Sequence, residues 1–419
     1  MITSIKFKNY KTFYKEVSIN FVANEQIKRF LCNASNTNNL NILKTIGIYG
    51  PNNTGKTCLI LALRNLKALM LNEPHEDLSN SFKDDSKTSY EVEYIMNETM
   101  YRYIVEYDNS NKTYITEELY KISIAPSNKS QKSIRSILKR KNNKLSLTID
   151  DDQALKAFDI QVSEQIPILM ALNFSSKSPL GKAKRDYIDF AHSINMIRMD
   201  SNDMIDKDLT TFNLMKNDAK AAAFIKEFVR NCDLHIDDFG LDENMESDID
   251  ISKEVFNPNI KKESFSFYSK HHGYRIPSFI FDSVGTRKII VMSGFIYDAI
   301  KNGKLLLIDE IDSSLHHIIT RAIVSMFNND LNKKAQLVFT THDLLLMDLQ
   351  YLFRKDQLYL TDIRDDESVL IPLTSFSSHD ENGIRGNEDI IQHYIQGKFG
   401  GIPTTNLFDS LEEAIDDGE

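Results

Sequence analysis

Gly50-Pro-Asn-Asn-Thr-Gly-Lys56-Thr57 is the stretch of sequence that decides the fold. It matches the pattern of a glycine, any four residues, and then glycine, lysine and a serine or threonine, which is typical of a phosphate-binding loop. A short β-branched run at 45–49 precedes it, and apolar residues at helical spacing over 58–70 follow it. In that order, backbone N–H groups and the positive end of the helix face the phosphates. The sequence therefore predicts a site for ATP or GTP.

Two side chains of this loop have expected roles. Lys56 is predicted to reach the β- and γ-phosphates, and the Thr57 hydroxyl to bind Mg²⁺. A chance match to the pattern occurs in roughly one chain in a hundred of this length. The residues predicted to bind the nucleotide here are Gly50, Asn52, Asn53, Thr54, Gly55, Lys56, Thr57 and Cys58.

A second apolar run, KLLLIDE at 304–310, ends in two carboxylates. Four consecutive apolar residues predict a buried parallel strand, and ligands bind at the carboxyl ends of such strands. We expect Asp309 to hold Mg²⁺ through water, and Glu310 to orient and polarise the attacking water. Without the phosphate loop, the same run would indicate only a strand that ends in solvent.

A third strand-like run, QLVFTTHD at 336–343, ends in His342. A lone histidine is more often structural than catalytic, but a histidine at the end of this strand is placed to sense the γ-phosphate. Asp343 beside it fits a helix cap.

The turn FDSVGTRK at 281–288 leads into the helical run that precedes the Asp-Glu strand. Ser283, Gly285 and Thr286 could cap that helix and present N–H groups to a phosphate. From the sequence alone, a plain helix start is the simpler interpretation.

The composition, 41% hydrophobic and 26% charged with a formal net charge of -10, is that of an ordinary globular protein. No apolar run is long enough to span a membrane and the first residues lack a secretory signal, so we expect a cytoplasmic protein. The three cysteines are far apart and fit neither a disulfide framework nor a zinc site. The negative charge does not favour nucleic acid. Seven basic residues within 129–144 could contact it, but a solvated hairpin face is the commoner explanation.

The expected fold class is α/β: a P-loop ATPase head with a mixed sheet, an antiparallel N-terminal β subdomain and a helical insertion. We expect four regions along the chain. They are an N-terminal lobe with the phosphate loop and a β meander (1–150), a helical insertion (151–240), a C-terminal lobe with the turn, the Asp-Glu strand and the histidine (241–403), and an acidic tail (404–419).

The order of these motifs resembles the head of an ABC-type ATPase, and the long gap between Lys56 and Asp309 resembles its SMC and OLD-like branch. The chain is most similar to the OLD-like, AAA-type ATPases that include RloA and AbiL-type abortive-infection proteins. The likeness spans residues 1 to about 403, in the blocks IKFKNYKTF, GPNNTGKT, TEELY, DSVGTRK, LLIDEIDSSLHHII, LVFTTHDLLLMD, FRKDQLYL and YIQGKFGGIP. The chain departs from the group at Asp282, where Glu is usual, and at His317, where Pro is common.

The resemblance implies ATP and Mg²⁺ as cofactors and a homodimer, or a higher homo-oligomer, that sandwiches two nucleotides. Each site would take Ser283, Gly285 and Thr286 from the partner subunit. It also implies an anti-phage ATPase that controls a separate effector, a nuclease or toxin, because the 16 residues after Pro403 cannot hold a nuclease domain. Two alternatives stay open: a scaffold that ATP stabilises around a toxic partner with negligible turnover, and an SMC-like DNA-repair ATPase.

Overall fold

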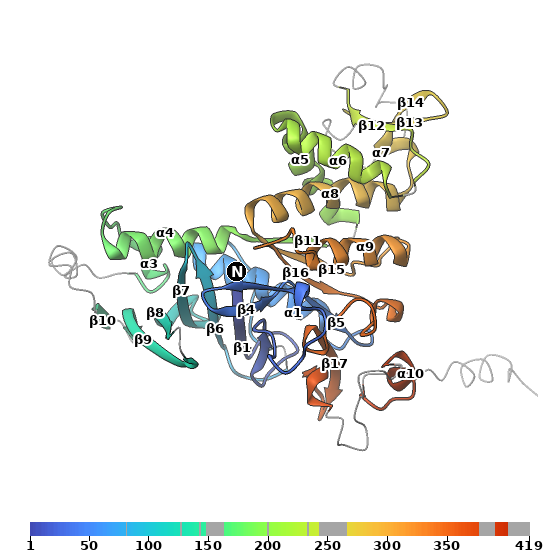
Figure 1. Cartoon of the computed structure of the whole chain (residues 1–419). Helices are drawn as coiled ribbons and strands as arrows, with labels where there is room; N and C mark the ends of the chain where they lie inside the picture. Colours follow the sequence, from blue (N-terminus) through green and yellow to red (C-terminus); the bar gives the residue numbers. More distant parts are fainter. Residues whose placement is uncertain are drawn as a thin grey trace, which may run out of the picture.

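The computed structural model describes nine stretches of the chain, which are residues 1–80, 82–125, 128–141, 144–147, 163–198, 201–232, 234–242, 266–376 and 390–400. Two large sheets with a helix between them form the lower part of the molecule in Figure 1, and a mainly helical part stands above them.

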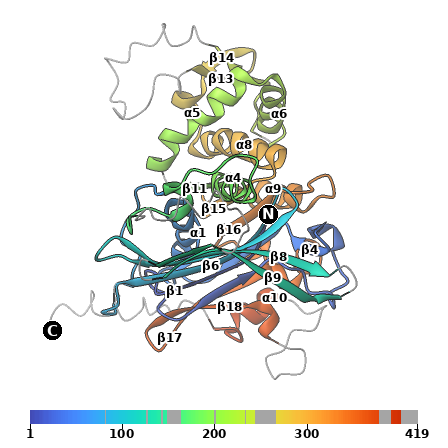
Figure 2. The ribbon, with the colours of Figure 1, turned by 90° about the vertical axis from the view of Figure 1, so that its left-hand side faces the viewer.

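The first sheet has seven strands, all antiparallel, in the order β10-β9-β8-β7-β6-β1-β2. Figure 2 views the molecule from the side of this sheet. Alternating apolar and polar residues form these strands, because one face of the sheet is buried. Their bounds are β1 Ile2–Lys8, β2 Val17–Asn20, β6 Lys87–Met96, β7 Thr99–Asp108, β8 Thr113–Ala125, β9 Asn128–Lys141 and β10 Lys144–Leu147.

The second sheet, here called the core sheet, has the order β11-β15-β16-β5-β17-β18. Its first five strands are parallel, and β18 pairs antiparallel with β17 at the edge. The bounds are β5 Thr45–Tyr49, β11 Ile194–Arg198, β15 Leu305–Asp309, β16 Gln336–Thr340, β17 Leu358–Arg364 and β18 Glu367–Pro372. Together the two sheets confirm the predicted class, a mixed α/β fold with an antiparallel N-terminal sheet.

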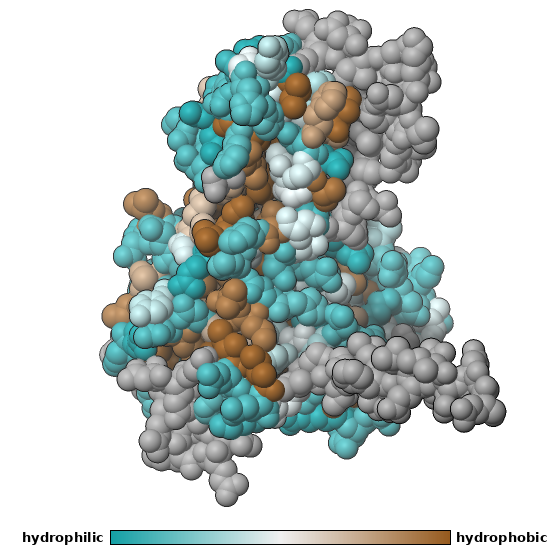
Figure 3. All heavy atoms as spheres, turned by 90° about the vertical axis from the view of Figure 1, so that its right-hand side faces the viewer, coloured by the Kyte–Doolittle hydropathy of each residue, from teal (hydrophilic) through white to brown (hydrophobic). Residues whose placement is uncertain are grey.

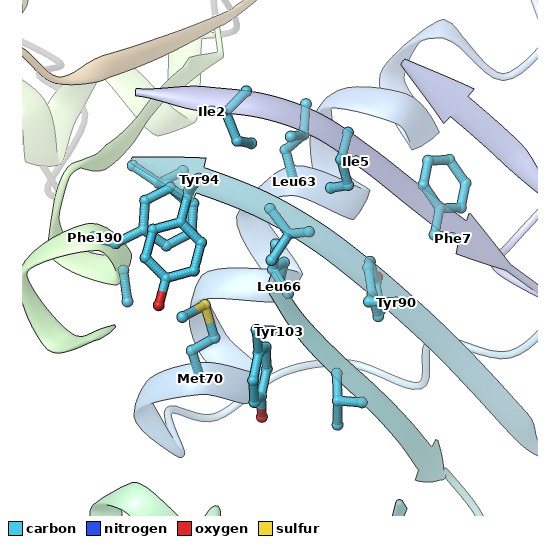
Figure 4. Packing of buried hydrophobic residues seen from close by; sticks show 14 of the residues in the cluster. Ile2, Ile5, Phe7, Leu63, Leu66, Met70, Tyr90, Tyr94, Tyr103 and Phe190 are labelled. Carbon is cyan, nitrogen blue, oxygen red and sulfur yellow. The ribbon is translucent and has the colours of Figure 1, made fainter. Parts of the chain in front are cut away.

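Helix α1 (Lys56–Leu71) packs between the two sheets and carries the main core. One of its faces meets the antiparallel sheet, where Leu63 and Leu66 lie among Ile2, Ile5 and Tyr90 (Figure 4). The same core includes side chains of β5, β15 and β16, so α1 is covered on both sides. This burial fixes the phosphate loop, because the loop ends where α1 begins.

The opposite face of the core sheet is covered by α8 (Val284–Asn302) and α9 (His317–Asn328). Successive residues of β15 alternate between the two cores: Leu305 and Leu307 belong to the α1 side, Leu306 and Ile308 to the α8 side. A strand buried on both faces needs an unbroken apolar run, which is the reason for the sequence LLLI.

The upper part consists of α5 (Ser201–Asn217), α6 (Ala219–Arg230) and α7 (Ser278–Phe281), packed with α8 and a small sheet of β12 (Asp238–Leu241), β13 (Phe267–His271) and β14 (Tyr274–Pro277). Two helices of the range 151–240, α5 and α6, belong to this part, whereas the helices at 168–171 and 179–192 of the same range lie beside the antiparallel sheet, and residues 151–162 lie outside the described part. β11 also falls within that range but belongs to the core sheet, where it pairs with β15. Its five residues, INMIR, are too short a run to separate from helical sequence by periodicity.

The remaining elements are β3 (Ala34–Thr37), β4 (Leu40–Leu43), α3 (Ile168–Ala171), α4 (Pro179–His192), α10 (Ile390–Ile395) and the 3₁₀ turns η1 (Leu31–Asn33), η4 (Leu344–Leu346), η5 (Lys355–Gln357) and η6 (Leu373–Ser375). Helix α4 packs on the antiparallel sheet, and its Phe190 ring stacks on Tyr94 with centroids 3.9 Å apart (Figure 4). None of the described helices is both long and apolar enough to cross a membrane.

The surface has apolar areas outside the buried cores. In Figure 3, brown residues form a band down one face of the molecule. A groove of about 340 Å³ lies between α6 and α9, lined mainly by Phe224, Phe228, Ile318, Ile319, Ile323 and Met326.

Candidate functional site

Three parallel strands bring most of the predicted site to one edge of the core sheet. β16 lies between β15 and β5, and the registers align Ile308 with Phe339 and Thr340 with Ile48. The carboxyl ends of all three strands therefore meet next to the phosphate loop, at the edge where open α/β sheets bind ligands.

The phosphate loop joins β5 to α1 through a tightly packed backbone. Gly55 has a φ of +97° and Asn53 one of +62°, both in the left-handed region. A Cβ at Gly55 would lie 2.8 Å from the ring of Phe13, and one at Gly50 would lie 2.2 Å from the Thr361 hydroxyl of β17. The glycines are thus required by close approach as well as by backbone conformation.

Thr54 fastens the loop to the neighbouring strand. Its hydroxyl donates to the Pro51 carbonyl at 2.8 Å and lies 2.6 Å from the Thr361 hydroxyl. The other predicted loop residues are exposed or half-buried, and they are Asn52, Asn53, Thr57 and Cys58. Thr57 is in the first turn of α1, where the pattern requires the hydroxyl.

The Lys56 side chain is buried inside the loop. Its Nζ donates to the carbonyl oxygens of Gly50 at 2.8 Å and Pro51 at 2.6 Å. The ammonium thus lies within the curve of the loop, which is the volume that a phosphate binds in such loops.

Three carboxylates surround this ammonium. The pKa of Lys56 is lowered mainly because burial disfavours the charged form, while Glu310, Asp309 and Asp312 act in the opposite direction. Residues more than 250 positions from Lys56 in the sequence therefore share one electrostatic environment with it, as the motif order predicted.

Asp309 and Glu310 differ in exposure although they are neighbours. Asp309 is buried at the end of β15 and accepts a hydrogen bond from the Thr340 hydroxyl at 2.7 Å. Glu310 is exposed, and its φ of +53° turns the chain out of the strand. The pair thus offers one fixed carboxylate and one that faces solvent.

His342 follows β16 and belongs to the same group of charges. Its backbone N–H donates to the Asp312 carboxylate at 3.3 Å. The pKa of its imidazole is lowered, first by the partial desolvation of the ring and next by Lys56, while the nearby carboxylates oppose this. Both effects favour the neutral ring, which can accept as well as donate a hydrogen bond. Asp343 caps η4 by accepting from the Leu345 N–H at 2.9 Å, which confirms the predicted cap.

The turn at 283–286 starts α8 and contacts the segment that follows the Asp-Glu pair. Ser283 caps α8 by accepting from the Thr286 N–H at 3.1 Å, as the simpler interpretation requires. A Cβ at Gly285 would lie 2.7 Å from the Ser314 carbonyl oxygen. Asp282, the departure from the resembled group, is held by Ser278 at 2.6 Å and by the His271 ring at 3.0 Å. No hydrogen bond in the described ranges joins the turn to residues 50–58.

The basic stretch at 129–144 forms much of β9, and three of its cations face carboxylates. Lys132 pairs with Glu93 at 3.1 Å, while Arg140 pairs with Glu117 at 2.8 Å. Lys139 lies 4.0 Å from Glu118. The two lysine pairs are those of a solvated face, whereas the Arg140–Glu117 pair is buried; in all three a carboxylate of this chain already faces the cation, which argues against a nucleic-acid site.

Three residues of this site, Asp312, Thr340 and Thr361, could not be predicted from the motifs. The first two stand inside quoted motifs, DEID and FTTHD, but their contacts depend on strand register. Nothing in the sequence around Thr361 points to the loop.

The sequence matches, over residues 46–348, the family described as AAA domain, putative AbiEii toxin, Type IV TA system. The chain belongs to this family. The family match and the fold agree with the resemblance at the level of an AAA- or ABC-type P-loop ATPase head, which is coarser than the OLD-like group.

Among solved structures, the AAA chain is similar to SMC heads. It matches the SMC head domain from Thermotoga maritima with 12% identity and a TM-score of 0.41, covering 88% of this chain and 98% of that one. It matches the Pyrococcus furiosus Smc head domain bound to the C-terminal domain of ScpA with 10% identity and a TM-score of 0.40, covering 88% and 95%. Likenesses this distant say nothing of what the chain binds. A search of curated proteins found no significant match.

Proposed function

We propose that this AAA domain hydrolyses ATP with Mg²⁺. The observation that carries the proposal is the meeting of Lys56, Asp309, Glu310 and His342 around one phosphate loop. A lysine inside the loop, a buried carboxylate, an exposed carboxylate and an imidazole are groups suited to phosphoryl transfer to water, in which the protein positions the reactants and stabilises charge.

The residues present fit Mg²⁺. No cluster of three or more metal-binding side chains exists in the described ranges. None is needed, because Mg²⁺ is usually bound by one or two protein oxygens together with substrate phosphates and water. Thr57 and Asp309 would supply those oxygens. When bound, the ion neutralises charge on the phosphates.

Each group of the site has a separate proposed role in binding or hydrolysis. Loop amides and the N-terminus of α1 would bind the phosphates, and Lys56 would exchange the carbonyls of Gly50 and Pro51 for phosphate oxygens. Glu310 would orient and polarise the water, and His342 would contact the γ-phosphate.

The site is completed by a second copy of the chain. In support, no hydrogen bond within the described part of the chain joins the turn with Ser283 to its own phosphate loop, and Phe281 and Val284 on either side of Ser283 are 65% and 49% exposed. Exposed apolar residues beside a capped helix start fit a surface that closes on another subunit. Ser283, Gly285 and Thr286 would then contact the partner's nucleotide.

At the cellular level, we propose an OLD-like ATPase subunit of an anti-phage, abortive-infection system that controls a separate effector, a nuclease or toxin. The description of the family and the motifs shared with RloA- and AbiL-type proteins support this role. Phage plating with the neighbouring gene present or deleted tests it: protection that does not depend on Lys56 or on the neighbour would contradict it.

Phosphate release by the purified chain, alone and with its neighbour, tests the chemistry. Lys56→Ala should lower nucleotide affinity, since it removes the buried ammonium. Glu310→Gln should lower kcat by about 100-fold or more with affinity nearly unchanged, because it removes the group that acts on water. Full turnover in both variants would reject hydrolysis at this site. Tight binding with negligible turnover in the wild type would favour the scaffold alternative.

A further inference from the structure

We propose that Thr340 is a positioning residue that sets both carboxylates of the site and links them to the histidine. The inference rests on the proposed function. It concerns a side chain that touches neither nucleotide nor metal and acts only through Asp309 and Glu310.

The Thr340 hydroxyl forms two hydrogen bonds at the end of β16, where the residue is fully buried. It donates to Asp309 Oδ1 at 2.7 Å and accepts from the Glu310 N–H, also at 2.7 Å. A hydroxyl has one donor and two acceptor sites, so both bonds can exist at once. The Thr340 carbonyl also accepts from the Ile311 N–H at 3.0 Å. One residue of β16 thus holds Asp309, the last residue of β15, and the two residues that follow it.

The second bond stabilises an uncommon backbone. Glu310 has a φ of +53°, which residues other than glycine rarely adopt without support. This turn leaves Glu310 exposed between the buried Asp309 and Ile311. An acceptor for the Glu310 N–H at this point therefore fixes the residue whose carboxylate would act on water.

A reciprocal bond completes the connection. Asp312 accepts from the His342 N–H, so residues 309–312 and 340–342 hold each other. We call this set of four hydrogen bonds the clasp. Through it the water-activating carboxylate and the γ-phosphate sensor move as one unit, and Thr340 is its central residue.

Two substitutions of Thr340 distinguish a role of its hydroxyl in positioning the carboxylates from a role of its side chain in packing. Thr340→Val keeps the shape and removes the hydroxyl, whereas Thr340→Ser keeps the hydroxyl and loses a methyl group. Outer residues that orient metal ligands typically contribute 10- to 100-fold in metal affinity or activity. We therefore expect Thr340→Val to lower kcat by about 10- to 100-fold and to raise the Mg²⁺ concentration for half-maximal nucleotide binding by about tenfold. Thr340→Ser should stay within about threefold of the wild type in both.

The readouts are binding of a fluorescent ATP analogue, in EDTA and across a Mg²⁺ titration, together with turnover and the thermal midpoint. Binding in EDTA should be unchanged in Thr340→Val, since the phosphate loop is not part of the clasp. A wild-type Mg²⁺ requirement in Thr340→Val, or equal damage in Thr340→Ser, would overturn the proposal. If Thr340→Val does not fold, Thr340→Ala takes its place, with the same expectations.

The outcomes for the proposed function are distinct. A wild type that binds Mg²⁺ and ATP without turnover contradicts hydrolysis, yet the Mg²⁺ titration of the Thr340 variants still decides the positioning role. A wild type that binds no nucleotide overturns both.

Discussion

His342 is the residue whose charge the site controls most directly. The pKa of its ring lies below the ordinary value of 6.5 because the ring is partly desolvated and Lys56 is near. At a pH between the lowered pKa of the folded state and the ordinary pKa of the unfolded state, the unfolded chain binds more protons than the folded one. Acidification through that range therefore destabilises the fold, and raising the pH restores the stability.

A titration of the histidine resonances by NMR checks this coupling. The His342 signal, identified by its loss in His342→Gln, should titrate below 6.5, and in Lys56→Ala its pKa should rise toward that value because a positive neighbour is gone. A pKa at or above 6.5 in the wild type, or a further decrease in Lys56→Ala, would contradict the arrangement.

At the scale of elements, β8 and β9 carry two adjacent cross-strand ion pairs, one buried and one exposed. Glu117 faces Arg140 with side chains 0% and 3% exposed, and Glu118 faces Lys139 with 21% and 41% exposed. Glu117 also accepts from the Ile168 N–H at 2.9 Å, and Arg140 donates to the Ser163 carbonyl at 3.0 Å. The buried pair thus fixes the chain that returns to the sheet after residue 162.

Glu117→Gln should lower the free energy of unfolding by about 3–5 kcal/mol, because it leaves a buried guanidinium without its counter-charge. The control is Glu118→Gln, which should cost less than about 1 kcal/mol, since its partner is exposed. Urea unfolding of both variants measures the difference. Equal losses would show that burial does not distinguish the two pairs.

The elements that the sequence predicts well are those with strong local patterns. β5 is predicted by a β-branched run, the phosphate loop by its two glycines, and α1 by apolar residues at helical spacing. The apolar spacing of α1 is pronounced because the helix is buried between two sheets. β11 and the partners of Thr340 and Thr361 could not be predicted in this way. Their positions depend on which strands pair with each other, and the sequence of a short run such as 194–198 does not indicate its pairing partner.

At the scale of the whole molecule, the proposed pairing of two copies gives a prediction about mass. Glu310→Gln with ATP and Mg²⁺ should double the 48.2 kDa mass of the chain, because nucleotide that is not hydrolysed keeps the subunits closed. Light scattering with and without nucleotide measures this. Adding Ser283→Arg should return the mass to that of one chain, with ATP affinity retained at the chain's own phosphate loop. A dimer whose mass is the same without ATP and with Ser283→Arg would indicate a different interface.

Helix α8 brings the capped turn back beside the residues that follow the Asp-Glu pair. The helix ends at Gly303 and leads into β15, which runs back along it. A Cβ at Gly285 would therefore lie 2.7 Å from the Ser314 carbonyl oxygen, and the Lys288 ammonium donates to the Ser313 hydroxyl at 3.0 Å. In a closed pair, a turn that contacts the partner's nucleotide would thus lie only a few residues from its own subunit's water-activating carboxylate, and displacement of one would be felt by the other.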